Sequence, residues 1–320
     1  MKCINRKLIV TVIFIVLCCV TGCANTSSSV TKYEGKTYRT ELYNGTCLSK
    51  DLCVVNENIN LTKFQYNSGF FATALMNVES KQVYLSSNVH KKVFPASTTK
   101  IMTLYLALKY GTLTDSVTVS KRAASVPKDS SVAGLLEGDT LTLKDLLYGT
   151  MLPSGNDAAV AVAEHISGSV EEFVALMNRE AQVLGASNTN FVNPHGYHDE
   201  NHYTTAYDLY LMLNQAVLNE TFCDIIHERS YRTVAYGKDG TPRELIWTQS
   251  NQFINGNRPV PANVTVIGGK TGTTGKAGAC LTLYVEDEQK EDYIAILMGA
   301  DSRTYLYDCM TYLLSYIPDL

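Results

Sequence analysis

The sequence predicts an α/β fold of the α+β type, with an antiparallel sheet flanked by helices and a helical subdomain inserted between its strands. The first observation is a strand-like pair followed by a helix, over residues 70–110. The second is that residues 141–218 show only helix patterns. The third is that residues 264–299 read as three further strands, ahead of a closing helix. A cleft where the sheet meets the inserted helices is a common place for an active site.

The expected strands are short apolar runs bounded by turn residues. They cover residues 70–78, 82–86, 117–120, 264–270, 279–285 and 293–299. The expected helices carry apolar residues at helical spacing. They cover residues 101–110, 141–148, 157–166, 170–184, 205–218 and 306–317, with Gly185 as a C-cap. Two polar segments, 238–240 and 255–257, are expected to be turns.

The first 22 residues are predicted to be a signal peptide that is not part of the fold. Three basic residues precede an apolar run over residues 8–20, which is short for a membrane span. The run ends in Val20-Thr21-Gly22-Cys23, which resembles a bacterial lipobox. Cleavage before Cys23 and a lipid on its sulfur are therefore expected. A plain signal peptide and an uncleaved anchor are the alternatives, and both also export the chain.

The rest of the chain is expected to be a tether followed by one domain. Residues 23–65 are polar and rich in Ser, Thr and Asn, as suits a tether with a short lead-in, and residues 66–320 carry the helix and strand patterns. The 320 residues are 45% hydrophobic and 18% charged, which is ordinary for a globular protein. A net charge of -4 gives no indication of a nucleic-acid partner.

The nine cysteines do not indicate a metal site. Four lie at or before Cys23, and there is no C-x-x-C pair of the kind that structural zinc sites use. Cys47 and Cys53 bracket a short polar segment, so they could form a small-loop disulfide in an oxidising compartment. The other three are expected to be buried thiols. They are Cys223, Cys280 and Cys309.

A serine stands three residues ahead of a lysine where the first expected helix begins. The stretch is Pro95-Ala96-Ser97-Thr98-Thr99-Lys100, and proline is compatible with a helix start. Ser97 and Lys100 are therefore expected one turn apart on the same helical face. A neutral lysine can take the proton of a serine hydroxyl, and a helix N-terminus disfavours a positive charge on it. The alternative is an N-capping residue followed by an ordinary helical lysine.

Two later patterns supply what such a serine would need. Ser154-Gly155-Asn156 precedes the helix at 157–166, and offers a hydroxyl that can relay protons and an amide that can bind a lysine. Lys270-Thr271-Gly272-Thr273 continues an apolar run, and suits an enzyme that lays a peptide along a strand edge and grips its carboxylate. Taken alone, the first could be an N-cap and the second a glycine-rich hairpin. The spacing of a phosphate-binding loop is absent.

In this order, the three patterns resemble the motif set of penicillin-recognising serine enzymes. The chain resembles the D-alanyl-D-alanine carboxypeptidases of the low-molecular-weight penicillin-binding protein class. The likeness also rests on the segments 152–159, 193–196 and 202–209, and it runs from about Phe70 to the C-terminus. It implies a β-lactamase/transpeptidase-like fold with a five-stranded antiparallel sheet, and a catalytic domain over residues 66–320.

The resemblance implies a role for each motif. Ser97 would be the nucleophile and Lys100 its base, while Ser154 would pass a proton to the leaving amine and Asn156 would position Lys100 and the substrate amide. Lys270 would supply positive potential for the terminal carboxylate, with Thr271, Gly272 and Thr273 beside it. The backbone N–H groups of Ser97 and Thr273 would form the oxyanion hole.

The implied substrate is the peptidoglycan stem peptide, with β-lactams as covalent inhibitors and neither a metal nor an organic cofactor. Two features depart from the family pattern. Arg303 lies a few residues before the place where many members carry a carboxylate-binding arginine. Many members also have a C-terminal β-domain with a membrane-binding helix, whereas this chain stops at Leu320. The lipid on Cys23 is expected to replace that anchor.

Three other functions compete with this interpretation. A class A β-lactamase would need a carboxylate between the second and third motifs, and the acids there are Glu164, Glu171, Glu172 and Glu180. A non-enzymatic penicillin sensor or scaffold would need a damaged motif, and all three are intact. A zinc peptidase could use the histidines around Asp199, but their spacing does not match H-E-x-x-H. They are His195, His198 and His202.

Overall fold

The computed structural model describes residues 51–61, 64 and 69–320, within a compact unit that spans Asp51–Leu320. The predicted signal peptide, the lipid site at Cys23, most of the tether and Cys47 lie outside the described residues. Within the described part of the chain, no helix has both the length and the apolar character needed to cross a membrane.

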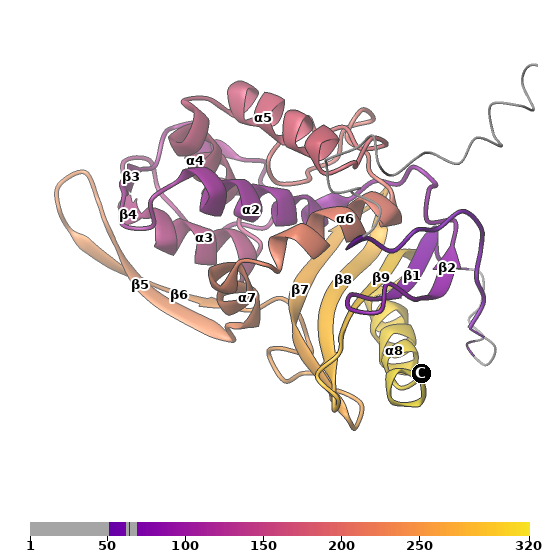
Figure 1. The fold of residues 1–320 in the computed structure, drawn as a ribbon. Coiled ribbons are helices and arrows are strands. Elements are labelled where there is room, and N and C mark those ends of the chain that lie inside the picture. The colour runs from indigo at the N-terminus through magenta and orange to yellow at the C-terminus, as the bar shows by residue number, and fades with distance from the viewer. Residues whose placement is uncertain (1–50, 62–63, 65–68) are drawn as a thin grey trace, which may run out of the picture. The chain divides into compact units, whose positions relative to one another are not determined.

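The centre of the unit is a five-stranded antiparallel sheet in the order β2-β1-β9-β8-β7 (Figure 1). Each of its strands was expected from the sequence. The strands are β1 (Ala72–Asn77), β2 (Val83–Ser87), β7 (Val264–Thr274), β8 (Gly278–Asp287) and β9 (Asp292–Ala300). Because β1 pairs with β9, the two ends of the described chain meet in the middle of the sheet. The predicted fold class is confirmed.

Alternating residues divide the core into two layers, one on each face of this sheet. In β9, Ile294 and Ile296 pack with the helical block, whereas Ala295 and Leu297 pack on the other face against α8 (Arg303–Leu314). Successive side chains of a strand point to opposite faces, so a strand buried on both sides must be apolar throughout. This is why β9 carries a continuous apolar run rather than an alternating one.

The inserted helices form the subdomain that the sequence predicted, and Figure 1 shows them beside the sheet. Their ends follow local capping rules: Thr142, Ser169 and Thr205 accept from backbone N–H groups as N-caps. Gly185 (φ 78°) closes a Schellman motif, as expected, with Ala186 N donating to Ala181 O. The helices are α2 (Lys100–Tyr110), α3 (Leu143–Met151), α4 (Asn156–Ser167), α5 (Val170–Val183), α6 (Ala206–Ala216) and α7 (Glu220–His227).

A second sheet, in the order β3-β4-β5-β6, is the main feature that the sequence did not predict. Only β3 (Ser116–Thr118) was expected; β4 (Thr140–Thr142) occupies the start of a segment predicted as helix. The turn expected at 238–240 joins β5 (Ser230–Tyr236) to β6 (Pro242–Thr248), and these two strands extend from the helices as an arm (Figure 1). Burial alternates along both strands, but the apolar residues do not follow it: Ile246 is exposed, whereas Arg243 lies on the same face as the buried Leu245 and Trp247. The sequence therefore shows no clear alternation.

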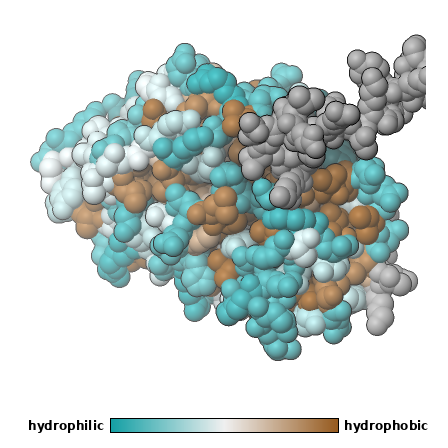
Figure 2. Space-filling view, viewed as in Figure 1, coloured by the Kyte–Doolittle hydropathy of each residue, from teal (hydrophilic) through white to brown (hydrophobic). Residues whose placement is uncertain are grey.

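In Figure 2 the visible face is mostly hydrophilic, with separate hydrophobic patches between polar residues. Cys280 and Cys309 are buried thiols as expected, and Cys223 is half-buried. Cys53 is a buried thiol that donates to Asn77 O at 3.3 Å, and Cys47, with which it could form a disulfide, lies outside the described residues.

Candidate active site

The first motif folds as a short 3-10 turn, η3 (Ala96–Thr99), that runs directly into α2. The sequence predicted Ser97 inside an α-helical turn, whereas Lys100 is the first residue of α2 and Ser97 precedes it. The expected proximity is nonetheless present, because Lys100 Nζ lies 3.1 Å from Ser97 Oγ. Ser97 is half-buried, and Lys100 is fully buried.

The contacts of the Lys100 amine suit a neutral base. Its Nζ lies 2.7 Å from Asn156 Oδ1 and 2.8 Å from the backbone oxygen of His195, and both of these atoms can only accept. A neutral amine has two N–H donors and one lone pair. The two donors satisfy Asn156 and His195, and the lone pair is left for the hydroxyl proton of Ser97.

Electrostatics favour the same protonation state. Burial lowers the pKa of Lys100 well below its usual value, and the positive charge of Lys270 lowers it further. The carboxylate of Asp157 acts in the opposite direction but does not reverse the shift. Lys100 can therefore accept a proton near neutral pH, which an ordinary lysine cannot do.

The residue before Ser97 is held in a strained conformation. Ala96 has φ 49°, in the left-handed region that non-glycine residues avoid. The Thr99 hydroxyl donates to Ala96 O at 2.8 Å and itself lies 2.8 Å from His202 Nε2. His202 Nδ1 accepts from Val192 N–H, so a neutral ring carries its proton on Nε2 and donates it to Thr99. This chain of hydrogen bonds fixes the carbonyl next to the candidate nucleophile.

Gly196 closes the same corner from the other side. A Cβ at this position would lie 1.7 Å from Ala96 O, and the residue has φ 84°. No other amino acid fits there without moving the Ala96 turn. The carbonyl of the neighbouring His195 is the one that binds Lys100, so the loop orients the candidate base and the strained turn together.

The second motif supplies an amide and an unpaired hydroxyl. Ser154 has φ 63°, and its buried Oγ has no hydrogen-bond partner among the described residues. Buried polar atoms are nearly always satisfied, so an orphaned hydroxyl indicates a partner that arrives with substrate or water. Asn156, the first residue of α4, reaches Lys100 as described above.

Asp157 anchors a loop that borders the site. Its two carboxylate oxygens accept from the backbone N–H groups of Ala133, Gly134 and Leu135, and Asn156 N donates to Ser131 O. The fixed loop places Ser131 and its neighbour Ser130 in the pocket wall. No role for Asp157 was predicted from the sequence, although its place directly after the Ser-Gly-Asn pattern was a signal for one.

The third motif lies on the edge strand of the main sheet, against the first motif. A Cβ at Gly272 would come within 3.0 Å of Ser97 N and Pro95 O, so the absence of a side chain lets β7 approach η3. Lys270 is fully buried, and burial together with the charge of Arg303 lowers the pKa of Lys270 to about 7. The Thr271 hydroxyl lies 2.9 Å from Ser250 Oγ, a contact the sequence did not predict.

These elements surround a pocket of about 260 Å³. Ser97, Asn156 and Thr273 line it, so one residue from each motif meets there. At its rim, Tyr197 donates from its hydroxyl to the carboxylate of Asp129, at 3.1 Å. The arrangement offers a serine, a buried base, a strand edge and a second lysine, which together suit acyl transfer.

A family profile described as D-alanyl-D-alanine carboxypeptidase matches residues 68–302. The chain belongs to this family. It is 36% identical over 236 residues to the D-alanyl-D-alanine carboxypeptidase DacF of Bacillus subtilis, and the aligned residues cover 72% of this chain and 57% of DacF. It is 35% identical over 240 residues to the D-alanyl-D-alanine carboxypeptidase DacC of Escherichia coli, and the aligned residues cover 72% of this chain and 56% of DacC. The chain thus spans little more than half the length of these curated relatives.

Solved structures show the same fold. The crystal structure of the Streptomyces K15 DD-transpeptidase matches with a TM-score of 0.73 and 27% identity, over 80% of this chain and 99% of that one. Penicillin binding protein 5 from Haemophilus influenzae matches with a TM-score of 0.70 and 30% identity, over 79% of this chain and 71% of that one. The β-lactamase/transpeptidase-like architecture implied by the motifs is therefore confirmed.

The four acids that a class A β-lactamase could have used do not line the candidate active-site pocket. Glu180 accepts from Lys109 and Tyr105, and Glu171 pairs with Arg122 on the surface. Glu164 and Glu172, which complete the set of four, are also absent from the pocket lining. No observation supports this alternative.

The three histidines do not converge on one point. His195 Nδ1 accepts from Tyr197 N, His202 bonds Thr99 and Val192, and His198 Nε2 lies 3.2 Å from Glu200. Across residues 51–61, 64 and 69–320, no group of three or more His, Cys, Asp or Glu side chains is arranged to hold a metal ion.

Proposed function

We propose that the protein is a serine-type D-Ala-D-Ala carboxypeptidase that removes the terminal D-alanine from peptidoglycan stem peptides. The observation that carries the proposal is the environment of Lys100. Its amine has two obligate acceptors and one hydroxyl neighbour, Ser97, in a buried site that favours the neutral form. Family membership and the intact second and third motifs support the same conclusion.

In the proposed acylation, Lys100 Nζ takes the proton of Ser97 as Oγ attacks the carbonyl carbon of the penultimate D-alanine. The backbone N–H groups of Ser97 and Thr273 stabilise the oxyanion. As the C–N bond breaks, Ser154 passes a proton from Lys100 to the departing amine, and free D-alanine leaves. Water then adds to the ester with Lys100 as base, which releases the shortened peptide and restores the Ser97 hydroxyl.

We assign recognition of the terminal carboxylate to Lys270, Thr271 and Arg303, with Gly272 allowing close approach. Arg303 begins α8, and its charge acts on the pKa of Lys270, so the two cations lie within electrostatic reach of each other. An incoming carboxylate would compensate both charges and raise the pKa of Lys270. A β-lactam presents an amide and a carboxylate in a similar arrangement and would acylate Ser97 covalently.

The proposal includes the location of the enzyme. Residues 1–22 act as a lipoprotein signal peptide, and a lipid on Cys23 holds the enzyme at the outer face of the cell membrane. Residues 23–65 are the tether, and residues 66–320 are the catalytic domain. The basic, apolar and Val-Thr-Gly-Cys pattern at the N-terminus is the support for this part. Metabolic labelling with a radioactive fatty acid, with Cys23→Ala as control, tests it.

The decisive experiment combines intact-protein mass spectrometry with a D-alanine assay. The wild type is expected to gain the mass of penicillin and to release D-alanine from a D-Ala-D-Ala peptide, and Ser97→Ala to do neither. Equal labelling of Ser97→Ala would refute the assignment of the nucleophile. Rapid turnover of a cephalosporin without D-alanine release would instead identify a β-lactamase.

A further inference from the structure

A second cavity, of about 360 Å³, adjoins the candidate active-site pocket. The two are separated by an aromatic contact: Phe94 lines the second cavity, His198 lines the active-site pocket, and their rings meet edge to face at 4.7 Å. The β7–β8 turn also joins them, since Gly275 lines the active-site pocket and Lys276 lines the second cavity. The mechanism described above does not use this cavity.

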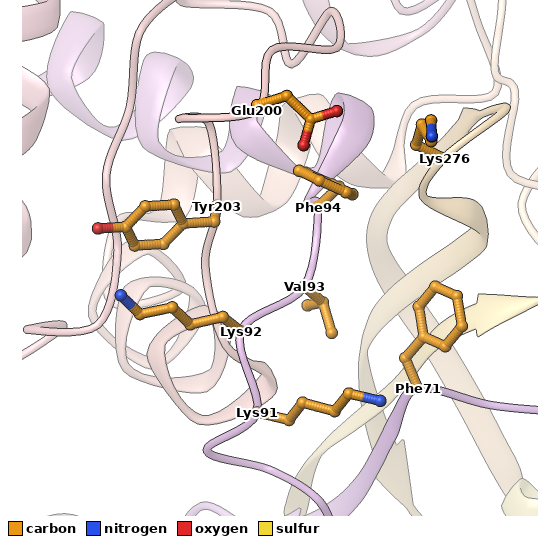
Figure 3. A pocket seen from close by; sticks show the side chains of 8 residues that line it. All are labelled: Phe71, Lys91, Lys92, Val93, Phe94, Glu200, Tyr203 and Lys276. Atoms are coloured by element: carbon orange, nitrogen blue, oxygen red, sulfur yellow. The ribbon is translucent and has the colours of Figure 1, made fainter.

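The second cavity is basic and aromatic. Figure 3 shows Lys91, Lys92 and Lys276 around it, with Phe71 and Tyr203 in its walls. Lys92 Nζ lies 4.1 Å from the centre of the Tyr203 ring, and Lys91 Nζ lies 5.3 Å from that of Phe71. These contacts hold the ammonium groups over aromatic faces without neutralising them.

Negative charge in the same place is scarce. Among the described residues that line the cavity, Glu200 is the one carboxylate, and it lies 3.2 Å from His198 Nε2. Among the residues that the structure describes, no acid forms an ion pair with any of the three lysines of the cavity. The lining therefore has a formal charge of +2 in a chain whose net charge is -4. Such a cavity is complementary to an anion.

The proposed function sets the direction in which substrate reaches this cavity, and the inference rests on it. A peptide whose terminal carboxylate lies at Lys270 and whose scissile carbonyl lies at Thr273 must run antiparallel to β7. Its amino-side residues then extend past Thr274 and Gly275, toward Lys276. The strand edge that recognises D-Ala-D-Ala therefore directs the rest of the peptide into the basic cavity.

We infer that this cavity is a subsite for a carboxylate carried by the stem peptide on the amino side of the scissile bond. Lys276 directly follows Gly275 on that path, and Lys91 and Lys92 line the cavity from the segment that leads to Phe94. The aromatic faces would cover the apolar part of the same residue. The subsite makes the enzyme prefer long acidic stem peptides over short D-Ala-D-Ala substrates.

The test compares three substrates. The first is a pentapeptide ending in D-Ala-D-Ala whose second residue is a γ-linked D-glutamate with a free carboxylate. The second is the same peptide with that carboxylate as a carboxamide, and the third is acetyl-D-Ala-D-Ala. The wild type is expected to show a kcat/KM several-fold higher for the free acid than for the amide, and this ratio should shrink with added salt.

The variants are Lys92→Gln and Lys276→Gln, with Lys144→Gln as the matched control. Lys144 is an exposed lysine on α3 that lines neither pocket, so its loss changes the net charge equally. Each cavity variant should lower the acid-to-amide ratio about 1.5- to fivefold, the range typical of an exposed charge pair. The control should leave the ratio unchanged, and all three variants should hydrolyse acetyl-D-Ala-D-Ala and react with penicillin as the wild type does.

The outcomes separate the inference from the proposed function. Release of D-alanine at equal rates from the acid and the amide, unaffected by the variants, would overturn the subsite and leave the carboxypeptidase intact. A ratio that falls equally in Lys144→Gln would also overturn it, because net charge alone would then explain the preference. Absence of D-alanine release from every peptide would refute the proposed function itself.

Discussion

Replacing Thr99 with valine removes one hydroxyl from the wall behind the candidate nucleophile and keeps the shape of the side chain. That hydroxyl donates to Ala96 O and receives the Nε2 proton of His202, each at 2.8 Å. Thr99 itself does not line the active-site pocket, so any effect on catalysis must pass through the Ala96 turn. We expect Thr99→Val to lose both stability and reactivity.

The size of each loss follows from the contacts. A buried polar group left without its partner costs about 1–3 kcal/mol, and the change leaves two, Ala96 O and the ring N–H of His202. The free energy of unfolding should therefore fall by about 2–6 kcal/mol. A strained left-handed residue stores about 1–3 kcal/mol, so Ala96 will relax once its carbonyl is released. Restoring the Ser97 geometry at a cost of about 1–2 kcal/mol would slow acylation roughly 5- to 30-fold.

Two measurements check this. Urea denaturation gives the stability, and the second-order rate of labelling by a fluorescent penicillin gives the reactivity. Thr99→Ser keeps the hydroxyl and should acylate within about twofold of the wild type. If Thr99→Val is destabilised as expected but acylates at the wild-type rate, the hydrogen-bond chain stabilises the fold without positioning Ser97, and the reasoning fails.

Three further predictions concern pH and backbone. The proposed mechanism needs Lys270 protonated, and its pKa is about 7, so kcat/KM should fall as the pH rises above about 7. The bound carboxylate raises that pKa, so kcat should fall only at higher pH. Stopped-flow measurements of both constants against pH check this. Gly196→Ala should abolish penicillin labelling, because its Cβ would lie 1.7 Å from Ala96 O. The control is Gly240→Ala, which has φ 78° and nothing within 4 Å of its Cβ. Urea denaturation should show that this control lowers the free energy of unfolding by only about 1–2 kcal/mol. Burial lowers the pKa of His195 to about 3 and that of His202 to about 4, so the unfolded chain binds more protons than the folded chain below about pH 6.5. As the pH falls from 6 to 4, each histidine should lower the free energy of unfolding by about 2 kcal/mol, with a slope of at most about 1.4 kcal/mol per pH unit. Replacement of His202 by glutamine should make that dependence shallower.

The main sheet and the helical block could be predicted because their sequences repeat with the period of the element they form. α5 shows its apolar residues at helical spacing between Ser169 and Gly185, and its structure follows those limits. The arm of β5 and β6 could not be predicted, because apolar residues such as Val234 and Ile246 stand on its exposed face, so the hydrophobic pattern does not follow the alternating burial. The strand at 140–142 was not predicted, because a strand of three residues is too short to show any period.

The site was predictable in part for a different reason. Ser97 and Lys100 are three residues apart, so the local chain alone brings them within reach. Thr99 and His202 contribute through contacts between segments more than 100 residues apart, at 2.8 Å, and nothing in the spacing of either residue indicates the other. Ala96 is the clearest case, because its positive φ contradicts its own preference and is imposed by Gly196 and Thr99. Local rules fail there because tertiary contacts override them.

The protonation of the two buried lysines likewise depends on the whole fold. Each loses hydration on burial, and the charge of Lys270 further disfavours a proton on Lys100. The pair therefore favours a state with a single proton, and Lys270 retains it because its pKa, about 7, is lowered less. That ordering leaves a neutral base beside Ser97 and a cation on the edge strand, where the proposed mechanism places the substrate carboxylate. Exchanging the charges would disable both roles, so the charged neighbours of the two lysines are as necessary for the proposed chemistry as the lysines themselves.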